Sequence, residues 1–151
     1  MSQQGQPVGR HGQFIQQFLN AISRNNKADI LSFFDEQSVF NNIPLEAVTG
    51  PEGIWGVLEP MYKIAQAAEY ELLNIAESST GSVLTERIDR YTLLHDGKTI
   101  TAEFLVMGTF DIEEGSDGEW VIRQWRDYFD LNQCLAQLPQ ALHAPEVTAV
   151  N

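Results

Sequence analysis

The chain has 151 residues, of which 43% are hydrophobic, and a formal net charge of −12 from 21 acidic and 9 basic residues. This length fits one domain, residues 1–151, that can bury a sizeable core. An acidic surface repels the phosphates of nucleic acids and of anionic membranes, so we expect neither as a partner. Cys134 is the only cysteine, which excludes an intrachain disulfide, and we interpret it as a small buried hydrophobe.

The ends of the chain are polar. Residues 1–13 lack the apolar run of a signal peptide, and nowhere is there an apolar stretch long enough to span a bilayer. We therefore expect a cytoplasmic protein with an ordered core of about residues 14–138. The C-terminal tail after Pro139 is expected to be mobile or to cover a pocket mouth.

The first half of the chain predicts helices. Apolar residues recur at helical spacing over 14–24, and a shorter helix is expected over 28–34. Residues 38–42 have the pattern of a short strand. A third helix is expected to start after Thr49 or Gly50 and to run to about Gln66, with a kink or break at Pro60.

The second half predicts strands over 68–78, 82–94, 99–112 and 119–129, joined by hairpin-like turns. Such a succession is typical of an antiparallel meander, and a last helix is expected over 131–138. Helices that precede a curved antiparallel or mixed sheet predict an α+β fold in which the N-terminal helices close a cone-shaped pocket.

The strand over 82–94 contains Arg87 and Asp89, which share one face because side chains alternate along a strand. Thr85 and Tyr91 lie on the same face. Two interpretations are open at this point. The pair is either an exposed ion pair of little energetic weight or part of a polar site.

The last strand places Asp127 on one face between Trp125 and Phe129. A carboxylate buried among aromatic rings needs a partner, and Arg87 is the natural candidate. The alternative is that Asp127 only ends the strand or caps the next helix, although Asp130 is better placed for that cap.

A third polar candidate is Asn42, which shares a strand face with Phe40 and precedes the Ile43-Pro44 turn. Its amide can hold a water or a substrate atom, or it can satisfy the local backbone. No two histidines have the spacing of metal ligands, and there is no glycine-rich phosphate loop. We therefore expect no metal site and no nucleotide.

The segment from Leu84 to Asp89, the later string Trp-Arg-Asp-Tyr-Phe-Asp over 125–130 and the Phe40–Pro44 stretch resemble the limonene-1,2-epoxide hydrolase family. The likeness extends over about 14–138. It implies a nuclear-transport-factor-2-like and SnoaL-like polyketide-cyclase-like fold, a cystatin-like α+β roll. It also implies one-step hydrolysis of an apolar epoxide to a vicinal diol without a cofactor, and a homodimer formed through the outer face of the sheet.

The resemblance also implies roles for individual residues. Asp127 matches the base that deprotonates water, Asp89 the acid that protonates the epoxide oxygen, Arg87 the bridging arginine and Asn42 a group that holds the water. The implied pocket wall consists of Phe40, Leu19, Ile22, Met61, Tyr91, Phe104, Val106 and Phe129.

Phe40 departs from the family pattern, which has a tyrosine at this position whose hydroxyl also holds the water. Loss of one such hydrogen bond costs about 1–3 kcal/mol in the transition state. Three functions therefore remain open. They are an epoxide hydrolase, another acid-base enzyme of the superfamily such as an isomerase or cyclase, and a non-catalytic dimer that binds small molecules.

Overall fold

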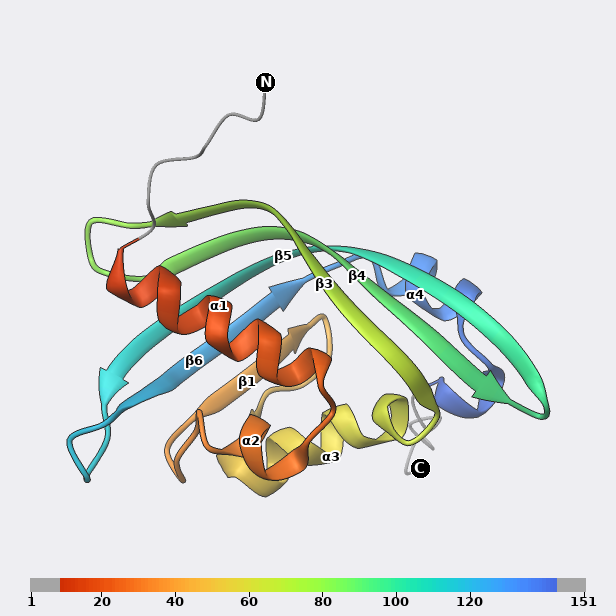
Figure 1. The fold of residues 1–151 in the computed structure, drawn as a ribbon, viewed down its shortest axis with the longest axis horizontal. Coiled ribbons are helices and arrows are strands. Elements are labelled where there is room, and N and C mark those ends of the chain that lie inside the picture. Colours follow the sequence, from red (N-terminus) through yellow and green to blue (C-terminus); the bar gives the residue numbers. More distant parts are fainter. Residues whose placement is uncertain (1–8, 144–151) are drawn as a thin grey trace, which may run out of the picture.

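The computed structural model describes residues 9–143, in which three helices and two short strands precede the four predicted long strands (Figure 1). All six strands form one sheet. The helices are α1 (Arg10–Ser23), α2 (Lys27–Leu31), α3 (Gly50–Tyr62), α4 (Leu131–Gln137) and a 3-10 turn, η1 (Gln140–Leu142). The strands are β1 (Val39–Ile43), β2 (Val48–Thr49), β3 (Ala65–Glu77), β4 (Val83–His95), β5 (Lys98–Glu114) and β6 (Trp120–Tyr128).

The sheet has the strand order β2-β1-β6-β5-β4-β3. Strands β3 to β6 form the predicted antiparallel meander, and β1 joins β6 in parallel. The sheet is strongly curved, and α1, α2 and α3 lie on its concave side (Figure 1). The α+β class is therefore confirmed. The parallel pair makes the sheet mixed and brings the first strand of the chain beside the last.

Two helix boundaries differ from the prediction. Helix α1 begins at Arg10 rather than Phe14, because contacts outside the helix hold its first turn: the backbone N–H of Gly12 donates to Glu77 (2.7 Å), and the His11 ring bonds the carbonyl of Gly81 (2.7 Å). Helix α3 includes Pro60 but ends at Tyr62 rather than Gln66. Proline cannot donate the helical hydrogen bond, and the chain enters β3 at Ala65.

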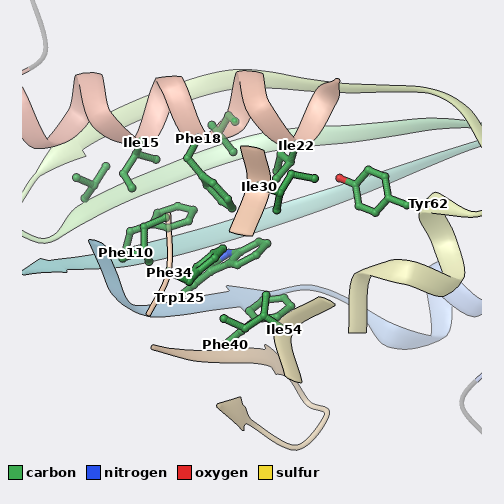
Figure 2. Close-up of a cluster of buried hydrophobic side chains, with 13 residues drawn as sticks. Ile15, Phe18, Ile22, Ile30, Phe34, Phe40, Ile54, Tyr62, Phe110 and Trp125 are labelled. Atoms are coloured by element: carbon green, nitrogen blue, oxygen red, sulfur yellow. The ribbon is translucent and has the colours of Figure 1, made fainter. Parts of the chain in front are cut away.

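The core fills the concave side of the sheet beneath α1. Helix α1 directs Ile15, Phe18 and Ile22 at the sheet, where Phe18 meets the edge of Trp125 with ring centroids 5.1 Å apart (Figure 2). Leu19 and Ile22, which we expected in the pocket wall, are only 4% and 1% exposed and belong to this core. The helical face was identified correctly, but Leu19 and Ile22 pack within the core and do not line the cavity.

The convex face of the sheet exposes large apolar side chains. Leu105 is 68% exposed, and Met107 and Tyr128, which pair across β5 and β6, are 47% and 44% exposed. Among the described residues no helix has the length and apolarity that a transmembrane span requires.

Candidate active site

A cavity of about 420 Å³ opens between the sheet, α3 and the C-terminal helix α4. This size suits a small organic molecule. Its lining includes the predicted wall residues Phe40, Met61, Tyr91, Phe104, Val106 and Phe129 and the polar residues Asn42, Asp89 and Asp127. The cavity is therefore mostly apolar, with two carboxylates in one region of its wall.

Arg87 joins the two carboxylates. Its Nε and Nη2 donate to both oxygens of Asp89, at 2.8 and 3.1 Å, and Nη2 also donates to Oδ2 of Asp127 at 2.6 Å. Nη1 donates to the hydroxyl of Thr85 at 3.1 Å. The three charged side chains are at most 8% exposed. The interpretation of Arg87 and Asp89 as an exposed ion pair is therefore wrong. The interpretation of Asp127 as a helix cap is also wrong, because Asp130 caps α4 by accepting from the N–H of Gln133.

The charges and the burial of this cluster favour a proton on Asp89. Burial opposes the charge of Arg87, but Asp127 and Asp89 outweigh it and raise the pKa of the guanidinium. Burial also raises the pKa of Asp89 to about 6, against the pull of Arg87. One cation balances one carboxylate, so a proton on Asp89 makes the buried cluster neutral.

Trp125 orients Asp127 from the opposite side. Its indole N–H donates to Oδ1 of Asp127 at 2.7 Å, while Arg87 occupies Oδ2. The indole ring is itself fixed by stacking on Phe40, with centroids 3.8 Å apart and planes at 19°. Two donors leave further lone pairs of the carboxylate open to the cavity. Asp127 can therefore accept a proton from a molecule there.

The strand pairing brings Asn42 beside Asp127. Their Cα atoms are partners in the parallel register of β1 and β6, and both residues line the cavity. Adjacent strands lie about 4.8 Å apart, so one water can contact both side chains. Phe40, two residues earlier, is 2% exposed and offers no hydroxyl.

Gly108 is a site residue that the sequence analysis missed. It lies on β5 opposite Thr85 and Asp127. A Cβ at this position would overlap Nη1 of Arg87 and would lie 2.5 Å from Oδ1 of Asp127. Glycine is thus required for the cluster to approach β5 so closely. The signal in the sequence was a lone glycine within a strand pattern.

The C-terminal part of the described chain also reaches the cavity. Leu138, Ala141, Leu142 and His143 line it, and the His143 ring contacts the carbonyl of Leu135 at 2.9 Å. This segment covers one side of the cavity, which agrees with the expectation that the tail after Pro139 covers a pocket mouth. The rest of the tail, residues 144–151, and residues 1–8 lie outside the described residues.

The arrangement offers one group that can donate a proton and one that can accept it in the same apolar cavity. Within residues 9–143, His, Cys, Asp and Glu side chains form no group of three that could hold a metal ion. Cys134 lines the cavity, and burial raises its pKa to about 12, so the sulfur stays a neutral thiol. The two carboxyl groups are therefore the candidate acid and base of the site.

Solved structures share this fold at low sequence identity. An LEH-like epoxide hydrolase of M. tuberculosis aligns with a TM-score of 0.66 and 24% identity, over 85% of this chain and 88% of that chain. A protein from Shewanella putrefaciens CN-32 that is predicted to be a SnoaL-like polyketide cyclase aligns with a TM-score of 0.75 and 12% identity, over 87% and 97%. A Catenulispora acidiphila protein with a ketosteroid isomerase-like fold aligns with a TM-score of 0.68 and 16% identity, over 92% and 100%.

The sequence itself matches a family model. The model of the limonene-1,2-epoxide hydrolase catalytic domain covers residues 10–140, which includes every helix and strand from α1 to α4. The chain belongs to the limonene-1,2-epoxide hydrolase family.

Proposed function

We propose that this protein adds water to a small or medium apolar epoxide in one step and releases a vicinal diol. The observation that carries the proposal is the bridge from Asp89 through Arg87 to Asp127 in the wall of an apolar cavity. Ring opening needs a proton at the departing oxygen while the attacking water loses one. A paired acid and base meet both needs in the same step.

Asp127 is the proposed base. Its carboxylate pairs with Arg87 at 2.6 Å, and its register with Asn42 gives a water two polar partners in the cavity. The water oxygen attacks an epoxide carbon, the C–O bond breaks, and the water proton passes to Asp127. The rigid contact of Trp125 with Oδ1 keeps the carboxylate in position through the step.

Asp89 is the proposed acid. Burial keeps its proton to a higher pH than for an ordinary aspartate, since its pKa is raised to about 6. Its proton moves to the epoxide oxygen as the ring opens. Asp127 then loses the proton that it gained to solvent, and Asp89 takes a proton from solvent. Addition of water leaves no net electron transfer, so the step needs no redox cofactor.

Diol formation from a panel of terpene, cyclohexene and styrene-type epoxides tests the proposal. Asp127→Asn keeps the shape of the side chain but removes the base, and we expect a loss of at least 1,000-fold in kcat/KM. Asp130→Asn is the matched control, since Asp130 is exposed and asparagine caps a helix equally well. Wild-type activity in Asp127→Asn would exclude Asp127 as the base.

Phe40 favours a second candidate, an isomerase or cyclase that uses the same acid and base without an attacking water. A site that moves a proton within one molecule does not require the hydroxyl that Phe40 lacks. Two results together would favour this candidate. The wild type would hydrolyse none of the epoxides, and it would exchange a proton at the α-carbon of a bound ketone, an exchange that Asp127→Asn abolishes. Exchange is followed by deuterium incorporation. Ligand binding without either reaction would leave the non-catalytic binder.

A further inference from the structure

Three tyrosine hydroxyls meet in the cavity wall. Tyr62 comes from the end of α3, Tyr70 from β3 and Tyr91 from β4, and all three line the cavity. The hydroxyl of Tyr70 bonds those of both Tyr91, at 2.7 Å, and Tyr62. We call these three residues the tyrosine cluster. Tyr70 was absent from the pocket wall expected from the sequence.

The tyrosine cluster lies on the side of Asp89 away from Asp127. Tyr91 follows Asp89 by two residues on the same face of β4. Tyr70 is the Cα partner of Asp89 across β3 and β4. Asp127 and Asn42 lie on β6 and β1, on the other side of β5. The cluster is therefore beside the acid and does not replace the hydroxyl missing at Phe40.

Figure 2 shows where Tyr62 lies relative to the rings of Phe40 and Trp125. Tyr62 stands apart from the stacked rings of Phe40 and Trp125, near the end of the core that Ile22 marks, and its hydroxyl points away from α3 into the molecule. The aromatic stack near Asp127 and the tyrosine hydroxyls near Asp89 thus form two distinct parts of the interior.

The tyrosine cluster has an unused donor. Three hydroxyls hold three hydrogens, of which two lie in the bonds to Tyr70. Among residues 9–143 no hydrogen bond joins the three hydroxyls to a group outside the cluster, and the cavity neighbours of the cluster include the apolar Met61 and Phe104. Burial raises the pKa of Tyr70 and Tyr91 well above the usual value, so the hydroxyls stay protonated donors. Each hydroxyl has a partner within the cluster, and the remaining hydrogen can be donated to an oxygen of a ligand.

We propose that the tyrosine cluster is an oxygen-binding subsite, so that the preferred substrate is an apolar epoxide with a second oxygen acceptor, such as a ketone carbonyl, beyond the epoxide ring. This inference deepens the proposed function and rests on it. Donor and acceptor hydroxyls in a chain polarise one another, so the outermost hydrogen of the cluster is a better donor than a single tyrosine. The cluster sets specificity and leaves the acid-base step to the two aspartates.

A matched pair of substrates tests the subsite. 4-Acetyl-1,2-epoxycyclohexane and 1,2-epoxy-4-isopropenylcyclohexane have nearly the same shape, but only the acetyl compound carries a carbonyl. We expect the wild type to prefer the ketone, and Tyr70→Phe to lower the ratio of the two kcat/KM values about tenfold, the effect of one net hydrogen bond. Tyr128→Phe, which removes an exposed hydroxyl outside the cavity, is the control and should leave the ratio unchanged.

A binding experiment separates this inference from the proposed function. It uses the two corresponding compounds without the epoxide, cyclohexyl methyl ketone and isopropenylcyclohexane. Calorimetry should show the ketone about tenfold weaker with Tyr70→Phe and the alkene unchanged. That result without any epoxide turnover supports the subsite and refutes the hydrolase. Turnover with a ratio unaffected by Tyr70→Phe and by Tyr91→Phe keeps the hydrolase and overturns the subsite. Equal effects on both ligands, or no binding of the ketone, also overturn it.

Discussion

Gly108→Ala should disturb the charged cluster without removing any of its members. Gly108 does not have a positive φ, so alanine fits its backbone, and the only conflict is the space that the methyl group needs. The added Cβ would overlap Nη1 of Arg87 and lie 2.5 Å from Oδ1 of Asp127 and 3.0 Å from Oγ1 of Thr85. An ordinary carbon–oxygen contact is about 3.5 Å, so the carboxylate must move by about 1 Å.

A displacement of about 1 Å is enough to break a hydrogen bond. Because the methyl group displaces both the guanidinium and the carboxylate, the 2.6 Å contact between Nη2 of Arg87 and Oδ2 of Asp127 cannot keep its geometry. Weakening a buried, hydrogen-bonded ion pair in this way should lower the free energy of unfolding by about 3 kcal/mol. If the proposed function holds, a 1 Å shift of the base should also lower kcat/KM about 100-fold.

Urea denaturation followed by circular dichroism measures the stability. Gly56→Ala is the control, because Gly56 is exposed in α3 and its Cβ would meet nothing within 4 Å. We expect it to stabilise the protein by about 1 kcal/mol, through helix propensity alone. A Gly108→Ala variant within about 0.5 kcal/mol of the wild type would refute the argument that β5 and the cluster are packed too closely for a side chain.

Three further predictions concern the site and the sheet. Phe40→Tyr should raise kcat about tenfold if the missing hydroxyl limits the hold on the water, and an unchanged or lower kcat would show that the water is held by other groups. The proposed acid must be protonated to act, and the pKa of Asp89 is raised to about 6. We therefore expect kcat/KM to fall about tenfold per pH unit above pH 6. A flat profile of kcat/KM from pH 6 to 8 would exclude Asp89 as the acid. We also propose a homodimer through the exposed apolar face of β5 and β6. Light scattering should therefore give twice the chain mass for the wild type and the chain mass for Leu105→Glu, and a monomeric wild type would contradict the proposal.

The sequence was most informative where the structure is regular along the chain. The period of two in the second half predicted four strands in nearly their observed positions, and it placed Arg87 and Asp89 on one face. Asp127 between Trp125 and Phe129 indicated burial, and burial required a counter-ion. These conclusions follow from local geometry and from the energetic cost of an unpaired charge.

The contacts that could not be predicted are those between distant segments. No local pattern shows that β1 pairs in parallel with β6, although this pairing brings Asn42 beside Asp127. The same limit explains Leu19 and Ile22, since periodicity shows that a helix face is buried but not whether it meets a cavity or the core. The meeting of Tyr62 with Tyr70 likewise depends on how α3 docks against the sheet.

Strand β4 places Arg87, Asp89 and Tyr91 at intervals of two residues. Successive side chains on one face of a strand are about 7 Å apart, and this spacing belongs to the backbone. A substitution can therefore change the chemistry at one of these positions without changing its separation from the others. If the proposed subsite is right, a substrate with a different distance between its two oxygens would require a bulge in β4 between Asp89 and Tyr91. The register shift in β3 between Leu72 and Asn74 shows that the neighbouring strand already accommodates such an irregularity.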